Sequence, residues 1–272
     1  MIYSLVTTFL SLPGINAISA AEASTASMEG LALFESPLVG YASANDKIFS
    51  RFRDEGEITH GRFIPPGKWL KDAKTVVSVF LPFSRRIVES NAQDPLFPSQ
   101  EWLHGRFEGQ QRIDALSRHL VTALNAKGYR AVAPSLEPDY RIFIGTWDCP
   151  DGTPDNSSYG STWSERHVAF AAGLGTFGLS RNLITDRGVA GRFTSIVTDM
   201  PHAPTPRCYS DPYEYCLSCG ACILTCPVQA IGEQGKEHTP CSAYLDKILE
   251  RTGMRYGCGK CQVDVPCSTS RP

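Results

Sequence analysis

Eight cysteines near the C-terminus constrain this chain more than any other feature of its sequence. They are Cys216, Cys219, Cys222, Cys226, Cys241, Cys258, Cys261 and Cys267. The first four have the spacing C-x2-C-x2-C-x3-C and are followed by proline, which is typical of a bacterial-type iron–sulfur site. Cysteines at every third position can wrap one face of a cubane, and the fourth cysteine of such a run ligates the other cluster in two-cluster proteins. Eight thiols therefore predict two [4Fe–4S] clusters.

A zinc site and a set of disulfides are the alternatives to this interpretation. Zinc sites usually show paired C-x2-C knuckles with a long spacer, not three cysteines in register before a Cys-Pro pair. Cubane clusters are sensitive to oxidants, so we expect a reducing cytoplasm as the compartment. The other two cysteines, Cys149 and Cys208, are expected to be buried thiols without a ligand role.

Composition narrows the class of protein. The chain has 272 residues, 42% hydrophobic and 20% charged, which predicts an ordered core and one large or two ordinary domains. A net charge of −2 argues against a nucleic-acid or anionic-membrane partner. No apolar run is long enough for a membrane span, and no Lys or Arg precedes Lys47, so we expect neither a span nor an export signal.

The regions before the cysteines show alternating strand and helix patterns. Residues 1–45 are expected to be irregular or weakly helical, except for a short strand at 38–43. Residues 75–81 are rich in Val and predict a strand, and 129–133 predict another. Between them, apolar residues at helical spacing predict a helix over 107–127; they are Ile113, Leu116, Leu120, Val121 and Leu124.

A polar segment at 145–161 is expected to be a functional loop. The sequence Thr-Trp-Ser-Glu at 162–165 predicts a capping box at the start of a helix over 163–172. Three glycines follow with the spacing G-x-G-x-x-G, but they come after a helix and precede a strand, which argues against a dinucleotide-binding fingerprint. Residues 182–185 and 192–199 are expected to pair as a β-hairpin, and 200–214 to form a linker.

Several stretches together resemble one family. They are 79–83 (VFLPF), 102–106 (WLHGR), 164–167 (SERH), 172–178 (AGLGTFG), 183–185 (LIT), 195–199 (SIVTD) and the cysteine run. The pattern resembles the epoxyqueuosine reductase and reductive dehalogenase superfamily over roughly residues 35–267. The Glu-Arg pair and the Gly-Leu-Gly stretch are the more specific part, because many ferredoxins share the cysteine spacing.

The resemblance implies a fold and a ligand set. It implies an α+β protein, with a mixed α/β sheet-and-helix domain (residues 1–200) that can hold a base-off corrinoid, before a bacterial-ferredoxin-like two-cluster module (201–272). By resemblance, one cluster is held by Cys216, Cys219, Cys222 and Cys267. The other is held by Cys226, Cys241, Cys258 and Cys261. Family members usually end in C-x2-C-x3-C-P, whereas the last cysteine here comes two residues later and follows its proline.

The resemblance also implies a proton donor. Epoxyqueuosine reductases carry an acidic donor six residues before the Glu of the Glu-Arg pair, and this position is Tyr159. Because reductive dehalogenases use a tyrosine, we expect Tyr159 to be the general acid. The glycines Gly173, Gly175 and Gly178 are expected to allow close approach of the backbone to a cofactor, with Asn182 beside it.

These features predict an iron–sulfur oxidoreductase. Electrons from a low-potential donor, such as a ferredoxin or flavodoxin, would pass through the clusters to a corrinoid (cobalamin) and reduce a small-molecule substrate. The family's helical-repeat tail, which helps to grip tRNA, has no counterpart in this sequence, which argues further against a nucleic-acid substrate. Two alternatives stay open: a flavin in place of the corrinoid, and a non-catalytic electron-transfer protein that serves a partner enzyme.

Overall fold

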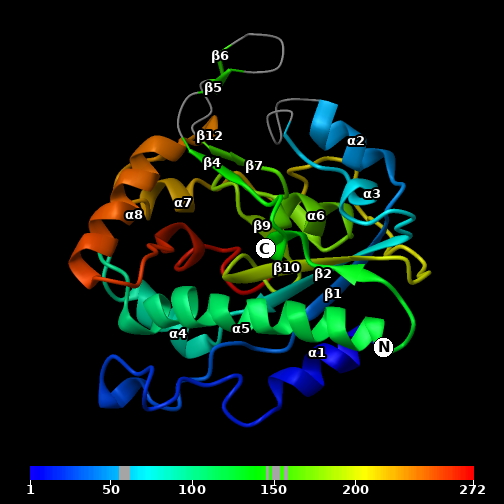
Figure 1. Ribbon diagram of the computed structural model, residues 1–272. Coiled ribbons are helices and arrows are strands. Elements are labelled where there is room, and N and C mark those ends of the chain that lie inside the picture. The colour runs from blue at the N-terminus through cyan, green and yellow to red at the C-terminus, as the bar shows by residue number, and fades with distance from the viewer. Residues whose placement is uncertain (55–61, 145–146, 149–153, 156–158) are drawn as a thin grey trace.

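A computed structural model describes residues 1–54, 62–144, 147–148, 154–155 and 159–272. Cys149 and much of the predicted loop at 145–161 lie outside the described residues. Each described helix is too short or too polar to cross a membrane. The fold is α+β, with one central sheet, helices on both of its faces, and the cysteine-rich segment at one end (Figure 1).

The central sheet has four strands in the order β1-β2-β10-β3, and every pairing in it is antiparallel. Its strands are β1 (Leu38–Ser43), β2 (Thr75–Pro82), β3 (Ala131–Val132) and β10 (Gly191–Thr198). β2 is buried at every position, because both of its faces are covered. On one face Val77, Val79 and Leu81 enter one core, while Val76 enters the core on the other. The predicted strands at 38–43 and 75–81 are confirmed.

The long helix α5 (Gln100–Asn125) covers one face of the sheet, together with α1 (Ile2–Leu10) and α4 (Arg85–Ala92) (Figure 1). Four residues of its predicted apolar stripe are buried and Val121 packs against the same core. The helix begins earlier than predicted, where the Ser99 hydroxyl accepts a hydrogen bond from Trp102 N (3.1 Å). α1 lies in the lead-in that was expected to be irregular or weakly helical, and it is a regular helix because Ile2, Val6 and Phe9 form one buried face at helical spacing.

The short helix α6 (Glu165–Ala171) covers the other face. Its start differs from the predicted capping box. The Thr162 hydroxyl instead accepts from Arg141 N (3.0 Å) and donates to Asp139 O (3.1 Å), so it holds the neighbouring chain rather than the helix. Ser164 occupies the N-cap position and makes no side-chain capping bond.

The predicted hairpin of 182–185 with 192–199 is wrong. Strand β9 (Leu183–Thr185) pairs with β8 (Gly175–Phe177), and β10 joins the central sheet instead. β10 is buried from Thr194 to Thr198 and fits between β2 and β3, where both of its edges find hydrogen-bonding partners. A strand did follow the glycines, as predicted.

The remaining elements are short, except for the 15-residue helix α8. The helices are α2 (Lys47–Asp54), α3 (Pro66–Trp69), α7 (Ala221–Leu224) and α8 (His238–Thr252), with 3-10 turns η1 (Ala26–Met28), η2 (Pro134–Leu136) and η3 (Lys260–Gln262). The paired strands are β4 (Ile142–Ile144) with β7 (Tyr159–Ser161), β5 (Trp147–Asp148) with β6 (Pro154–Asp155), and β11 (Ile231–Gly232) with β12 (Gly235–Lys236). The segment predicted as a loop therefore contains three of these strands.

The cysteine-rich segment is seated closely on the rest of the chain. The Asn91 amide donates to Cys258 O (3.0 Å), and Lys260 Nζ donates to Asn91 O (2.6 Å). At Gly259, whose φ is +70°, a Cβ would lie only 1.9 Å from the Trp102 ring. Glycine therefore allows η3 to rest directly on α5.

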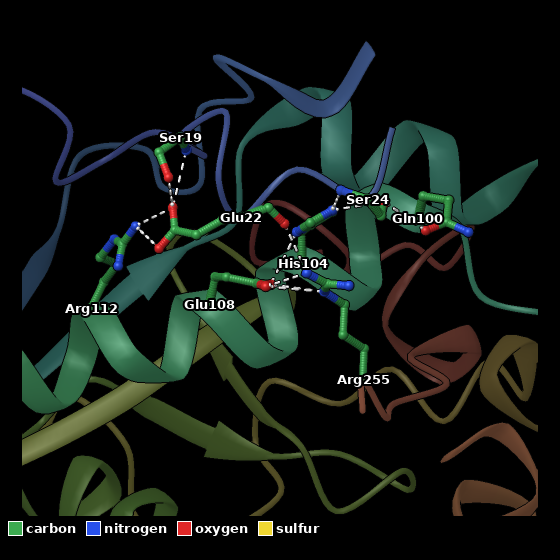
Figure 2. A network of polar contacts seen from close by, with 8 residues as sticks. All are labelled: Ser19, Glu22, Ser24, Gln100, His104, Glu108, Arg112 and Arg255. Atoms are coloured by element: carbon green, nitrogen blue, oxygen red, sulfur yellow. Dashed lines mark hydrogen bonds and ion pairs between the residues drawn. The ribbon is translucent and has the colours of Figure 1, made fainter. Parts of the chain in front are cut away.

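A buried ion-pair network strengthens this contact (Figure 2). Glu108 of α5 is 3% exposed at its side chain and accepts hydrogen bonds from Arg255, with Arg255 Nη2 to Glu108 Oε1 at 2.5 Å. The other Glu108 oxygen lies 3.0 Å from His104 Nδ1, and His104 Nε2 contacts the Ser24 hydroxyl at 2.9 Å. Three distant segments thus meet at one carboxylate.

A second pair extends the network toward the N-terminal segment. Arg112 Nη2 donates to both Glu22 oxygens, at 2.6 and 2.7 Å, and Arg255 Nη2 donates to Glu22 O (2.8 Å). Burial acts to raise the pKa of Glu22, but hydrogen bonds from Arg112 and Ser19 prevail and lower it to about 2. The network holds residues 19–24 and Arg255 against the same helix.

Glu108→Gln tests the importance of this network. Burial acts to raise the pKa of Glu108, but hydrogen bonds from His104 and Arg255 outweigh it, so the folded-state pKa is lowered. The stabilisation that the ionised Glu108 carboxylate contributes is therefore present above the pKa that this group has in the unfolded chain. It is lost as pH falls through the pKa that the group has in the folded protein. Because the change leaves Arg255 buried without a counter-charge, we expect a loss of about 3 kcal/mol at pH 7, measured by urea unfolding.

The matched control is Arg85→Gln, which breaks the exposed Arg85–Glu89 pair. We expect this control to change stability by less than about 1 kcal/mol. Equal losses in the two variants would show that the buried network contributes nothing special.

Candidate iron–sulfur and substrate site

One set of thiols lines a single pocket. Its cysteines are Cys216, Cys219, Cys222 and Cys267. The loop that carries the first three turns at Gly220, whose φ of +72° is a left-handed conformation that glycine adopts without strain. Cys267 arrives from the C-terminal end, where its carbonyl accepts a hydrogen bond from Val189 N (2.9 Å). The structure thus brings together the four cysteines that the resemblance assigns to one cluster.

Electrostatic effects among the thiols show the same grouping. Burial first, and then the neighbouring Cys222, Cys216 and Cys219, raise the pKa of Cys267 to about 11. Burial, with smaller contributions from Cys261 and Cys241, raises the pKa of Cys258 to about 12. These additions require the thiols of each set to lie near one another.

The second set is linked to the first through one pair of thiols. Burial raises the pKa of Cys261, and Cys241 and Cys226 act in the same direction. The pKa of Cys222 is raised to about 11, first by burial and next by the neighbouring thiol of Cys261. The two sets therefore adjoin at Cys222 and Cys261.

This arrangement suits a cubane better than a single ion. No three His, Cys, Asp or Glu side chains in the described part of the chain converge on a point where one metal ion would fit. A [4Fe–4S] cubane places its four thiolates on separate irons, so they need to surround a volume and not a point. Buried thiols that repel one another as thiolates also suit a cationic iron core, which stabilises the deprotonated form.

Asn182, predicted as a cofactor-binding residue, lies beside the second set. Its amide donates to Cys261 Sγ (3.5 Å) and to the Ser180 hydroxyl (3.0 Å). Gln262 Nε2 approaches Asn182 Oδ1 at 3.4 Å. Hydrogen bonds to a ligand sulfur tune the potential of an iron–sulfur cluster, so this amide is placed to act on a cluster.

The three glycines are packed against the chain itself. At Gly175 a Cβ would lie 1.9 Å from Ile184 O, across the β8–β9 pair, and at Gly173 it would lie 3.1 Å from the Thr205 side chain. At Gly178 it would lie 3.7 Å from Cys216 Sγ. Packing accounts for these glycines, and their contact with a further cofactor stays a prediction.

Tyr159, the predicted proton donor, lies on β7 with its side chain partly exposed. Its ring stacks on His238 of α8, with centroids 4.3 Å apart. The Tyr159 hydroxyl is close enough to Arg166 and Tyr140 to influence the pKa of both groups. The phenol is thus held between the sheet domain and the cysteine-rich segment.

Glu165 is a feature that sequence reasoning did not single out as a site residue. Both of its carboxylate oxygens are buried, and among the described residues no group is within hydrogen-bonding geometry of them. Burial raises its pKa to about 7, and the neighbouring Ser195 acts in the opposite direction. Only the Glu-Arg pair in the sequence pointed to this position. Perturbed buried carboxyls of this kind are frequent in functional sites.

Sequence comparisons name no family for this chain, since no protein-family model and no curated protein matches it. Solved structures do match. The catabolic reductive dehalogenase NpRdhA aligns with a TM-score of 0.51 and 13% identity, over 86% of this chain and 30% of that one. Its complex with 3-bromo-4-hydroxybenzoic acid aligns with a TM-score of 0.52.

Epoxyqueuosine reductases are also similar. The Bacillus subtilis enzyme aligns with a TM-score of 0.47 and 17% identity, over 100% of this chain and 67% of that one. A selenomethionine-labelled epoxyqueuosine reductase aligns over 66% of its length. This chain thus spans about two thirds of those reductases and under a third of the dehalogenase. The structural neighbours are the two groups named by the sequence resemblance, and this chain shares the fold of the dehalogenase over 86% of its own length.

Cys267→Ser tests the least regular ligand of the eight. Because Cys267 completes the first thiol set, we expect anaerobically reconstituted protein to fall from about eight irons per chain to about four, measured by iron and sulfide assay. The matched control is Cys208→Ser, which changes an exposed thiol outside both sets. Unchanged iron in the Cys267 variant, or an equal loss in the control, would contradict the assignment.

Proposed function

We propose that the chain is an iron–sulfur oxidoreductase that passes electrons from two [4Fe–4S] clusters to a corrinoid in its N-terminal domain, for reduction of a small substrate. The observation that carries this proposal is the pocket that Cys216, Cys219, Cys222 and Cys267 line together. The shared fold supports it, because the similar structures are reductases. The presence of the N-terminal domain also supports the proposal, because a simple electron carrier needs no sheet domain of this size.

The clusters would form an ordered electron path. The first set includes Cys219, which is exposed, and therefore lies nearer to solvent and to a donor such as a ferredoxin or flavodoxin. The second set is held by Cys258 and Cys261 against α5, Asn91 and Asn182. Electrons would enter at the first set, cross at Cys222 and Cys261, and leave toward the N-terminal domain.

The corrinoid, when bound, would supply the two-electron reduction of the substrate. Residues of the N-terminal domain would line its site next to the second cluster, where Asn182 is buried and polar. The chain's own contribution to the chemistry is a proton. The Tyr159 hydroxyl would donate it to the reduced substrate, and the stacked His238 holds the phenol in place.

A non-catalytic electron-transfer protein is the second candidate. The exposed side chains of Leu217 and Leu224, at 64% and 88%, favour it, because both lie within the cysteine run and suit contact with a partner protein. In this candidate the N-terminal domain would serve as a docking scaffold and would bind no corrinoid.

Cobalamin binding distinguishes the two candidates. We expect anaerobically reconstituted protein to bind added cobalamin and to reduce it in the presence of dithionite, followed by visible absorption and by iron, cobalt and flavin content. Reduction should fail in Cys219→Ala, because the electron path would be cut. A protein with full clusters that neither binds nor reduces cobalamin would contradict the corrinoid proposal, and bound flavin would replace it.

Tyr159→Phe serves as the matched control. The phenyl ring keeps the stacking on His238 and loses only the hydroxyl, so cluster content and cobalamin reduction should equal those of the wild type. Loss of either property would show that Tyr159 supports the structure and does not act as a proton donor.

A further inference from the structure

One lysine of the cysteine-rich segment is buried. Lys260, the first residue of η3, is 3% exposed, and no other lysine of the described residues is buried. It belongs to the sequence Cys-Gly-Lys-Cys at 258–261, between two cysteines of the second thiol set, which is Cys226, Cys241, Cys258 and Cys261. Lysine is rarely buried unless its charge is paired, so this position calls for a partner.

The Lys260 ammonium group is fixed by hydrogen bonds to the end of α4. Its Nζ donates to Asn91 O at 2.6 Å and to Asn91 Oδ1 at 3.3 Å. Asn91 is itself fully buried, and its amide donates to Cys258 O at 3.0 Å. A single side chain therefore joins the ammonium group to the backbone of a proposed cluster ligand.

These hydrogen bonds leave the charge of Lys260 without a balancing negative charge. Within the described residues no carboxylate forms an ion pair with it. Asn91 O lies in the last turn of α4, where a helix presents roughly half a negative charge. Capping this helix end accounts for the position of the ammonium group, but it balances only part of the charge. A buried charge without a full counter-charge is costly.

The thiols of the second set are brought to the same part of the molecule as Lys260. The helical turn η3, which carries Lys260 and Cys261, packs against α7. Cys226 follows the end of α7, and its Sγ accepts a hydrogen bond from Ala230 N at 3.2 Å. The Asn182 amide donates to Cys261 Sγ. Packing and hydrogen bonds thus hold two of the proposed ligand sulfurs beside η3.

A cluster on these thiols would supply the missing negative charge. Four thiolates give a [4Fe–4S] cluster a net negative charge, which increases by one when the cluster is reduced. Cys261 follows Lys260 directly, and consecutive Cα atoms are only about 3.8 Å apart. Because the ammonium group is buried, protein and not water separates it from the cluster, so its attraction is weakly screened.

The first thiol set has no cation in the same position. Its four cysteines line one pocket with glycine, serine, proline and aliphatic residues, and the described residues that line this pocket include no Lys, Arg or His. The surroundings of the two proposed clusters therefore differ in charge.

We propose that Lys260 is the counter-charge of the second cluster and raises its reduction potential. A nearby cation stabilises the reduced cluster more than the oxidised one, because the reduced cluster is the more negative. In the transfer itself, one electron leaves the first cluster and enters the second, and no atom or proton moves. The proposal rests on the proposed function for the clusters and their order, and it adds the residue that favours electron flow toward the N-terminal domain.

Reduction potentials test this role without any substrate. The measurement is a redox titration of the anaerobically reconstituted chain, followed by electron paramagnetic resonance. In Lys260→Met we expect one potential to fall by at least the equivalent of about tenfold in the equilibrium constant, about 59 mV for one electron. The potential of the other cluster should stay as in the wild type. Unchanged potentials in a Lys260→Met chain with full iron would overturn the proposal.

Two further variants separate charge from hydrogen bonding. Lys260→Gln removes the charge and keeps a donor for Asn91 O, so it should lower the same potential, and it decides the case if the Met variant fails to fold. Lys260→Arg keeps the charge and should recover at least part of the wild-type potential. A wild-type potential in Lys260→Gln would show that the hydrogen bond, and not the charge, sets the value. Circular dichroism and iron content check that each variant is folded.

Lys247→Met is the matched control, because Lys247 is an exposed lysine on the helix that carries Cys241. Water and salt screen its charge, so both potentials should equal those of the wild type. An equal shift in this control would overturn the special role of Lys260. The Cys267→Ser chain, expected to keep only the second cluster, should show the Lys260→Met shift in its remaining signal, and no shift there would assign Lys260 to the other cluster.

Iron content distinguishes failure of this proposal from failure of the proposed function. A wild-type chain that never holds a second cluster overturns the proposed function, and the role of Lys260 with it. A chain that holds both clusters, with potentials that do not respond to Lys260, overturns the role of Lys260 alone. Cobalamin takes no part in the measurement, so the result is independent of the corrinoid.

Discussion

The cysteine-rich segment has little apolar core of its own, so other interactions must hold it in shape. From residue 201 onward, the buried apolar side chains of the described structure are Ala230, Ile231, Ile248, Val263 and Val265. Helix α7 buries no residue, and α8 buries only Ile248. Burial of this small area cannot offset the entropy lost on ordering some seventy residues. Docking on α5 supplies part of the difference, and ligation of the proposed clusters by the eight thiols would supply the rest.

The contacts of the cysteine-rich segment with α5 also fix where the proposed clusters would lie. Trp102 and Gly259 meet in direct contact, and Asn91 and Lys260 bond across the same contact. The buried Glu108–Arg255 pair adds a contact with a strict geometric requirement. The second thiol set is thereby held against the sheet domain, where Tyr159 lies. The distance and orientation for electron transfer would be a property of this interface, not of the cysteine loop alone.

Local patterns in the sequence predicted the local parts of this structure. The β-branched run at 75–81 and the apolar stripe of α5 predicted one strand and one helix, because both signals depend on neighbouring residues. The pairing of β10 was missed, because β2 and β10 are brought together by the whole fold. The capping box failed for a related reason: Thr162 bonds with Asp139 and Arg141, which a local motif does not include.

The residues of the candidate site also fall into those that the sequence could predict and those that it could not. The resemblance implies the two cysteine sets, and the structure brings Cys216, Cys219, Cys222 and Cys267 together around one pocket. The Glu108–Arg255 pair joins residues 147 positions apart and left no signal in the sequence. Long-range electrostatic partners are chosen by the tertiary structure, so spacing does not reveal them.

The central claim is that two clusters lie side by side, joined at Cys222 and Cys261. Electron paramagnetic resonance of the fully reduced, reconstituted protein tests it most directly. Two adjacent reduced clusters should give a broadened spectrum from magnetic interaction, and Cys219→Ser should simplify it to the spectrum of one isolated cluster. A wild-type spectrum of one isolated cluster, or of two that do not interact, would contradict the account.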